Sequence, residues 1–304
     1  MTAIGAMGEH EVIRRLVSML GDDAGLLVGA GDDCAVCCMP GVGMDQVFTT
    51  DPVVEGVHFL HGEIPERIGN KAVGRVLSDI AAMGARPQWL LVNVVAAPGT
   101  EMEYLEGIYV GMSALCSRFG ATIIGGDLSK GAQLELHLFG TGLLPSGSAL
   151  LRSGAKAGDS VCVTGVLGGS SAGKHLDFIP RVEEGIFLRE TGLVNAMMDV
   201  SDGLATDLRH ILAQSKVGAD LDAEAIPVVD GLNAALYDGE DFELLLTTSD
   251  PGSLQAQWKD RFGSGLPLIG KITEEGGVLR LDGEVVESKA YEHFSNHNQG
   301  ERNE

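Results

Sequence analysis

Acidic residues beside glycine, serine or threonine recur along the chain, in places where a carboxylate can project into a cleft. Six such groups lie at residues 31–33, 49–51, 78–79, 125–127, 199–203 and 238–241. A single aspartate in such a position most often caps a helix or shapes a turn. Six groups together favour a site for hard divalent cations, because Mg²⁺ binds through a few carboxylates together with substrate phosphates. The pattern indicates metal-assisted binding of a phosphorylated ligand such as a nucleoside triphosphate.

The composition favours a globular protein without a nucleic-acid or membrane partner. Apolar residues make up 44% of the 304 residues, and 21 Lys and Arg against 43 Asp and Glu give a net charge of −22. Such a surface repels nucleic-acid phosphates and anionic lipid. No apolar run reaches the roughly 18 residues of a membrane span, no secretion signal is recognisable, and the five cysteines do not resemble a secreted disulfide framework. We therefore expect a cytoplasmic protein.

Two further motifs suggest other chemistry. Residues 168–174 fit the P-loop pattern G-x-x-x-x-G-K after an expected strand, but His175 stands where that motif needs a hydroxyl for Mg²⁺. A glycine-rich connection between a strand and a helix is the favoured interpretation. Cys34 and Cys37 have the spacing of a metal or redox pair, but no second pair follows, so a buried strand is favoured there.

Apolar periodicity predicts a chain that alternates helices and strands. Helices are expected at residues 9–20, 66–83, 102–119 and 205–214, strands at 34–39, 46–50, 89–96, 121–124, 134–143, 160–164, 242–247 and 268–272, and a hairpin near Asp282-Gly283. The turn-rich stretch 145–158 separates an N-terminal domain, residues 1–146, from a C-terminal α/β domain, residues 147–294. Residues 295–304 are polar or glycine and are predicted to be a disordered tail.

The order of the motifs resembles the thiamine-monophosphate kinase family, in the superfamily of aminoimidazole ribonucleotide synthetase. The motifs that carry the resemblance are Gly31-Asp-Asp33, Thr50-Asp51, Glu55-Gly-Val-His-Phe59, Lys71-Ala72, Ser78-Asp-Ile-Ala-Ala-Met-Gly-Ala85, Ile124-Gly-Gly-Asp127, Leu151-Arg-Ser-Gly-Ala155, Val163-Thr-Gly165, Asp199-Val-Ser-Asp-Gly-Leu204 and Gly239-Glu-Asp-Phe-Glu-Leu244. They are collinear over residues 5–294, and the run at 78–85 is the most diagnostic.

The resemblance implies an α/β fold of two domains, the synthetase-like fold, with the N-terminal sheet shared in a homodimer. It implies an enzyme, a kinase that binds ATP and Mg²⁺ in the cleft between the domains. The γ-phosphoryl group of ATP would pass directly to the phosphate of thiamine monophosphate, giving thiamine diphosphate. We assign no general base, because a phosphate nucleophile is already ionised at neutral pH.

The resemblance also assigns residues to roles. Those implied to bind Mg²⁺ are Asp33, Thr49, Thr50, Asp51, Asp79, Asp127, Asp199 and Asp202. Those implied to contact ATP are Gly126, Asp127, Arg152 and Ser201, and those implied to face the thiamine phosphate are His58, Glu240 and Tyr291. Asp32 is interpreted as a turn residue.

Two departures from the family pattern lie near the acceptor. Asp238 stands where the family usually has glycine, and Phe242 where it has tyrosine; Leu128 and Ser129 replace two threonines. The segments before Arg181 and before Glu240 are also short for the family. Two alternatives stay open at this point: a related ATP-dependent enzyme that acts on another phosphorylated metabolite, and a non-catalytic nucleotide-binding scaffold.

Overall fold

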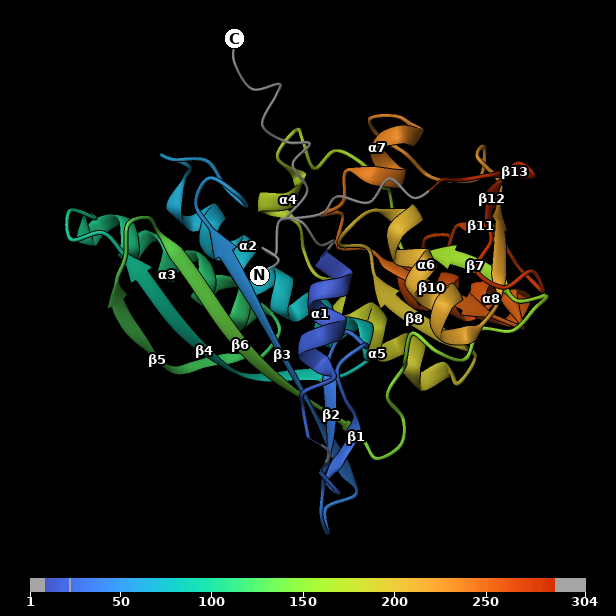
Figure 1. The fold of residues 1–304 in the computed structure, drawn as a ribbon, viewed down its shortest axis with the longest axis horizontal. Helices are drawn as coiled ribbons and strands as arrows, with labels where there is room; N and C mark the ends of the chain where they lie inside the picture. The colour runs from blue at the N-terminus through green and yellow to red at the C-terminus, as the bar shows by residue number, and fades with distance from the viewer. Residues whose placement is uncertain (1–8, 22, 288–304) are drawn as a thin grey trace.

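The computed structural model describes residues 9–21 and 23–287, which form two sheets with helices packed against them (Figure 1). The first half comprises α1 (Glu9–Val17), β1 (Leu26–Val28), β2 (Ala35–Met39), β3 (Met44–Val54), α2 (Pro65–Ala82), β4 (Arg86–Ala96), α3 (Met102–Arg118), β5 (Thr122–Lys130) and β6 (Glu135–Pro145). The second half comprises β7 (Ser160–Val163), α4 (Lys174–Asp177), α5 (Val182–Thr191), β8 (Ala196–Asp199), α6 (Leu204–Ser215), β9 (Gly218–Leu221), α7 (Leu232–Tyr237), β10 (Leu244–Thr248), α8 (Pro251–Phe262), β11 (Leu268–Thr273), β12 (Leu279–Leu281) and β13 (Glu284–Val285).

The first sheet has the strand order β1-β2-β3-β6-β4-β5, and only its β4–β5 pair is parallel. Helices α2 and α3 cover one face of this sheet (Figure 1). The two helices approach closely because glycine lies at their contact. A Cβ at Gly69 would lie 2.1 Å from the carbonyl oxygen of Ile108, and one at Gly111 would lie 2.0 Å from that of Glu66. Glycine at these two positions lets the backbones meet.

The opposite face of the first sheet carries exposed apolar side chains. Along β4, alternate residues such as Leu90 and Val92 are buried beneath the helices, whereas Trp89 and Leu91 keep 49% and 39% of their surface exposed. On the same exposed face, Phe139 of β6 stacks on Phe48 of β3 with 6.0 Å between ring centres. This open face is defined here by Phe48, Trp89, Leu91 and Phe139. A contiguous apolar patch of this kind is typical of an interaction surface.

The second sheet has the order β13-β12-β9-β11-β7-β10-β8. Strands β7 and β10 and the edge strand β8 are buried along their whole length, because both of their faces are covered. Helix α6 packs Leu208 and Ile211 against one face. The other face shares its core with the first half of the chain, where Met197 and Leu244 join α2. Helix α2 is therefore buried between the two sheets.

Most of the predicted elements are confirmed, and the observed bounds of α2 and α3 lie within one residue of the predicted ones. The predicted strand 121–124 proved too short, since β5 continues through the glycines to Lys130. Sequence reasoning missed β1, β8, β9, α5, α7 and α8. The chain passes between the sheets over residues 146–159, so the domain boundary near residue 147 stays a prediction. The predicted tail, residues 295–304, lies outside the described residues.

Among the described residues, no helix combines the length and the apolar character that a membrane crossing requires.

Candidate active site

Three buried or half-buried carboxylates meet where the two halves of the molecule adjoin. Asp33 precedes β2, Asp79 lies on α2, and Asp199 ends β8. One oxygen from each lies within 4.8 Å of the other two. Three separate elements therefore deliver their carboxylates to one point, and the structure brings together three of the residues that the resemblance implied to bind Mg²⁺. We call this set the carboxylate cluster.

The carboxylate cluster holds more negative charge than its neighbours neutralise. Burial, followed by the charges of Asp51 and Asp199, raises the pKa of Asp79 well above its usual range. Burial and the charge of Asp33 raise the pKa of Asp199 to about 7. Arg152 compensates in part, because its guanidinium donates to Asp33 over 2.6 Å. The other oxygen of Asp33 is buried and has no hydrogen-bond partner, as expected of a group that waits for a cation.

The pKa of Asp199 predicts a pH-dependent stability of the metal-free protein. The unfolded carboxyl releases its proton near pH 3.8, whereas the folded one holds it up to about pH 7. The stability that this proton provides is therefore lost as the pH rises from about 4 to about 7. Asp199→Asn resembles the protonated form and does not titrate. In a buffer that contains a chelator, we expect Asp199→Asn to have a higher free energy of unfolding than wild type. The difference, measured by urea denaturation, should grow as the pH rises from about 4 to about 7. An advantage independent of pH would contradict the shift.

The three predicted metal ligands on β3 do not all lie on the same face of the sheet. Thr49 and Asp51 face α2, where the Thr49 hydroxyl donates to Asp79 and Asp51 accepts from Arg75 over 2.8 Å. Thr50 lies between them in sequence and faces the other side, because side chains alternate along a strand. Its hydroxyl donates to a main-chain carbonyl of β6. Within one chain, the structure brings Thr49 and Asp51 to the carboxylate cluster but not Thr50.

Gly126 and Asp127 lie on β5, the edge strand of the first sheet. Asp127 is exposed and pairs with Asn93 of β4, which in turn pairs with His137 of β6. Asp51 pairs with the next residue of β6, so its side chain points to the helix-covered face and that of Asp127 to the open face. The structure therefore separates Asp127 from the carboxylate cluster within one chain, and its assignment as a ligand stays a prediction.

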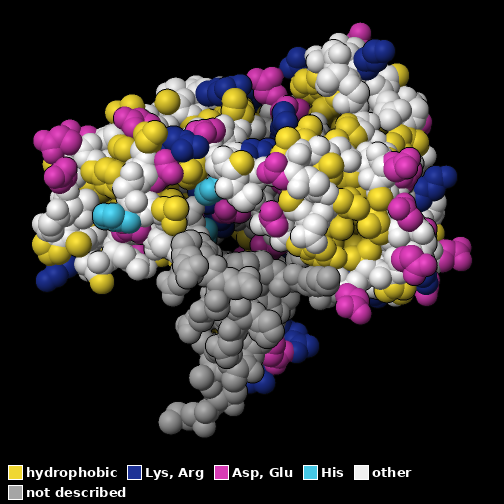
Figure 2. Space-filling view, turned by 90° about the horizontal axis from the view of Figure 1, so that it is seen from above, with side chains coloured by type: hydrophobic (Ala, Val, Ile, Leu, Met, Phe, Trp, Pro, Cys, Tyr) yellow, Lys and Arg dark blue, Asp and Glu magenta, His cyan; other side chains and the backbone are white. Residues whose placement is uncertain are grey.

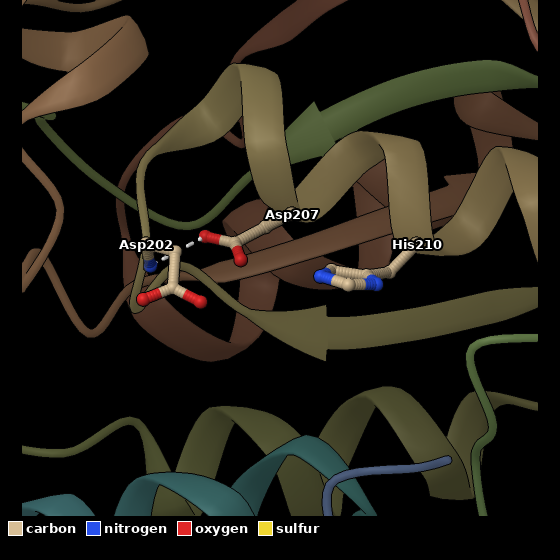
Figure 3. Close-up of side chains that lie close together, drawn as sticks. All are labelled: Asp202, Asp207 and His210. Carbon is tan, nitrogen blue, oxygen red and sulfur yellow. Dashed lines mark hydrogen bonds between the residues drawn. The ribbon is translucent and has the colours of Figure 1, made fainter. Parts of the chain in front are cut away.

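The loop that follows β8 carries the other predicted contacts of ATP and metal. Asp207 of α6 accepts hydrogen bonds from the backbone amides of Ser201 and Asp202, each over 3.0 Å. Asp202, Asp207 and His210 each place one potential ligand atom within 4.8 Å of the other two (Figure 3). Sequence reasoning missed Asp207 and His210. Their i, i+3 spacing on one helical face, just after the Asp202 loop, is a signal that could have found them.

Arg152, which the resemblance implied to contact ATP, lies beside the carboxylate cluster, and its role at ATP stays a prediction. Its backbone amide donates to Asp32 over 2.6 Å, and its side chain donates to Asp33. The interpretation of Asp32 as a turn residue fits this backbone contact. The guanidinium is half-buried and its Nε atom has no hydrogen-bond partner, so donors remain on this side chain beyond those that contact Asp33.

A pocket of about 780 Å³ opens between residues 56–67 of the first half and residues 170–176 and 237–240 of the second. Arg75 links its wall residue Glu240 to Asp51, beside the carboxylate cluster. In the space-filling view, acidic, basic and histidine side chains gather in the hollow between the two lobes (Figure 2). His58 and Glu240, both predicted to face the acceptor, line this pocket. Tyr291 lies outside the described residues. Tyr237, which sequence reasoning did not single out, supplies an aromatic ring to the pocket wall.

Basic residues surround Glu240 on the inner side of the pocket. Its carboxylate lies 2.6 Å from the ammonium of Lys71, 3.4 Å from the guanidinium of Arg75 and 3.3 Å from the ring of His175. Lys71 is fully buried, and burial lowers its pKa to about 8 although Glu240 opposes that shift. The backbone φ of Glu240 is 54°, a conformation uncommon for a residue with a side chain. We call Lys71, Arg75 and His175 the basic set.

The P-loop alternative is not supported by the position of its lysine. Lys174 donates to the carbonyl of Val166 and to the buried carboxylate of Asp241. The preceding glycine-rich residues form one wall of the pocket. The loop thus connects β7 to α4 and shapes the pocket, as the favoured interpretation expected. Cys34, just before β2, and Cys37, in the middle of β2, are free thiols, and burial raises the pKa of both.

Models of a known protein family match both halves of the chain. Residues 31–144 match the N-terminal domain of AIR synthase related proteins, and residues 176–282 match the C-terminal domain. Together the two matches contain all three residues of the carboxylate cluster and the whole of β3, α2 and α6. This is the class of two-domain protein that the fold and the site define.

Individual relatives narrow the class. Thiamine-monophosphate kinase of Buchnera aphidicola (subsp. Acyrthosiphon pisum) is 36% identical over 308 residues, which cover 90% of this chain and 94% of the relative. The enzyme of that name from Escherichia coli K12 is 34% identical, and the alignment covers 95% of this chain and 99% of the relative. A solved structure, AaThiL complexed with AMPPCP and TMP, aligns with a TM-score of 0.85 at 28% identity. The alignment covers 96% of this chain and 99% of that one. The chain therefore belongs to the thiamine-monophosphate kinase family, as its motifs indicated.

Proposed function

We propose that this protein transfers the γ-phosphoryl group of ATP to the phosphate of thiamine monophosphate, giving thiamine diphosphate and ADP. One observation carries the proposal: Arg75 contacts both Asp51, beside the carboxylate cluster, and Glu240, in the pocket wall. A site for a metal-bound triphosphate and a site for an organic acceptor therefore share a boundary. The similar solved structure that holds AMPPCP together with TMP supports the same pair of ligands.

The carboxylate cluster fits Mg²⁺. Its ligand atoms are oxygens, they lie close together, and Asp33 keeps one of them buried and unpartnered. Asp33, Asp79 and Asp199 would hold the ion, with Thr49, Asp51 and Asp202 near it. When bound, Mg²⁺ screens the repulsion between two anionic reactants.

We expect the affinity for ATP to depend on Mg²⁺, since carboxylates outnumber bases at the proposed donor site. Calorimetric titration with ATP should show binding with Mg²⁺ and at least about tenfold weaker binding with a chelator. Equal affinities in the two buffers would argue against the carboxylate cluster as a metal site.

The protein's own contribution to the reaction is positioning and charge compensation. An oxygen of the acceptor phosphate forms the new bond to the γ-phosphorus, and the bond from that phosphorus to the bridging oxygen of ADP breaks. The attacking phosphate is already ionised, so no residue needs to remove a proton. Arg152 and Arg75 can compensate the charge of the phosphates on either side, because each lies beside the carboxylates of the donor site.

The remaining assignments belong to the same proposal. Gly126, Asp127, Arg152 and Ser201 would contact ATP, Thr50 and Asp127 would complete the metal site, and His58, Glu240 and Tyr291 would face the acceptor. A homodimer is supported by the open face of the first sheet, which a second copy would cover. A cytoplasmic location agrees with this activity.

The direct test is a transfer assay. Purified protein is incubated with γ-³²P-ATP, Mg²⁺ and one acceptor at a time: thiamine monophosphate, unphosphorylated thiamine, or other phosphorylated metabolites. Label should appear in thiamine diphosphate and not on free thiamine. Transfer to a different phosphorylated acceptor would establish the related-enzyme alternative, and ATP binding without any transfer would establish the scaffold.

A further inference from the structure

A fully buried lysine lies behind the pocket wall and contacts three of the residues that line it. The ammonium of Lys71 donates to the main-chain oxygen of His58, and it contacts the Nδ1 atom of His175 and the Oε1 atom of Glu240, each over 2.6 Å. Because an ammonium has only donors, Nδ1 of His175 acts as an acceptor and the ring is neutral. Burial and the charge of Lys71 also lower the pKa of His175, which agrees with a neutral ring.

The carboxylate of Glu240 lies at the centre of the basic set. Its Oε1 atom is shared between the ammonium of Lys71 and the guanidinium of Arg75. Its Oε2 atom lies 3.3 Å from Nδ1 of His175, which accepts from Lys71 and therefore donates nothing to Glu240. Two cationic donors, Lys71 and Arg75, converge on one carboxylate oxygen, and such a pair of donors also suits a bound oxyanion. The Glu240 side chain keeps 26% of its surface exposed and lines the pocket, whereas Lys71 behind it has none exposed. Glu240 therefore lies between the buried ammonium and the pocket.

We propose that Lys71 and Arg75 of the basic set form an oxyanion subsite for which the carboxylate of Glu240 and the phosphate of the acceptor compete. The inference rests on the proposed function, since it locates the acceptor's phosphate within that site. A phosphate that takes the donors of Lys71 and Arg75 releases Glu240 toward the pocket. The released carboxylate then faces the cationic ring of the same ligand. A ligand with both a phosphate and a cation satisfies both groups, and a ligand with only one of them leaves the other unpaired.

This exchange explains how one site can select a ligand that carries opposite charges at two places. With Glu240 on the basic set, a cation in the pocket finds the carboxylate already engaged by Lys71 and Arg75. With phosphate on the basic set, leaving Glu240 unpaired would be costly unless a cation is present. The exchange of Glu240 for phosphate therefore couples recognition of the acceptor's phosphate to recognition of its cationic ring. Without such exchange, the same contacts would only fasten α2 to the turn at residues 238–242.

Glu240→Gln separates these two possibilities, because it removes the competing charge and keeps the shape of the side chain. Titration with inorganic phosphate in a magnesium-free buffer, followed by ³¹P NMR, should show about tenfold tighter binding to the variant than to wild type. Titration with unphosphorylated thiamine should show weaker binding to the variant. Phosphate affinity that is unchanged or lower in Glu240→Gln would overturn the proposal.

Asp238→Asn is the matched control. Asp238 lines the same pocket two residues away, and the contacts described for it include none with the basic set. It removes the same charge from the pocket, so its effect on phosphate affinity should stay within about twofold. An effect as large as that of Glu240→Gln would mean that only the overall charge of the pocket matters, and it would also overturn the proposal.

A second variant guards against a folding defect. In Glu240→Gln, the further change Lys71→Met removes the buried ammonium together with its partner, so no unpaired charge is left between these two positions. We expect the gain in phosphate affinity to disappear while the melting temperature stays near that of Glu240→Gln. A gain that persists without Lys71 would place the phosphate elsewhere. Because these titrations contain no ATP, they succeed or fail independently of the transfer assay that tests the proposed function.

Discussion

Replacing Asp79 by asparagine is expected to lower kcat by about a thousandfold while making the metal-free protein more stable. The two effects have one cause. Asp79 faces Asp33, Asp51 and Asp199, and their charges together with burial raise its pKa. Removing its charge relieves that repulsion, and it also takes away an oxygen ligand of the proposed Mg²⁺ site. Asparagine keeps a carbonyl oxygen that can accept the hydrogen bond from Thr49.

Two measurements check this prediction. At pH 8 in a chelator, the melting temperature of Asp79→Asn should exceed that of wild type by about 2–4 °C, the shift expected for about 1 kcal/mol in a domain of this size. Adding Mg²⁺ should raise the melting temperature of wild type, because a ligand of the folded state stabilises it, and should leave Asp79→Asn almost unchanged. A variant that melts earlier than wild type in the chelator would show that Asp79 serves packing rather than metal binding.

Asp45→Asn provides the matched control on β3. Asp45 is also buried, but its carboxylate accepts from the Ser146 hydroxyl and from the Gly147 amide, so its partners are already complete. It lies six residues from Asp51, about 20 Å along an extended strand. We expect this variant to lose stability and to keep kcat within about threefold. The opposite signs of the two stability changes separate a metal carboxylate from a structural one.

The sequence could predict the elements whose pattern is local. Helix α2 follows from apolar residues on one face before Gly84 and Pro87, and its observed end is within one residue of the prediction. That Asp33, Asp79 and Asp199 belong to one site could be predicted only from the family resemblance. No local pattern shows that Asp33, Asp79 and Asp199 meet, because three elements distant in the chain deliver them.

Other features depend on tertiary structure that local reasoning did not capture. The resemblance assigned Thr49, Thr50 and Asp51 together to the metal site, yet alternation along β3 places Thr50 on the opposite face of the sheet within one chain. The glycines before Asp127 suggested a turn, whereas tertiary pairing with β4 keeps them in a strand. The burial of Lys71 beside Glu240 has no signal in composition or periodicity, since a lysine on a helix is ordinarily exposed.

The position of Asp127 predicts that its substitution has a large effect on activity, and that this effect acts between the two chains of a dimer. Its side chain points to the open face of the first sheet, away from the carboxylate cluster of its own chain. The exposed Trp89, Leu91 and Phe139 share that face. If a second copy covers the face, Asp127 is buried in the dimer and can complete the site of the partner subunit. Light scattering should then give the mass of a dimer, and Asp127→Asn should lose most of its activity without losing dimerisation.

Mixing two inactive variants distinguishes action within a chain from action across the dimer. Asp79→Asn and Asp127→Asn, unfolded together and refolded at equal concentrations, form homodimers and heterodimers in the ratio expected for random pairing. If Asp127 serves the partner's site, each heterodimer has one site with both residues intact, and about a quarter of wild-type activity returns. If Asp127 acts within its own chain, every site carries a defect and no activity returns. Mixing Asp79→Asn with Asp199→Asn is the control. These two residues meet in one chain, so that mixture should stay inactive.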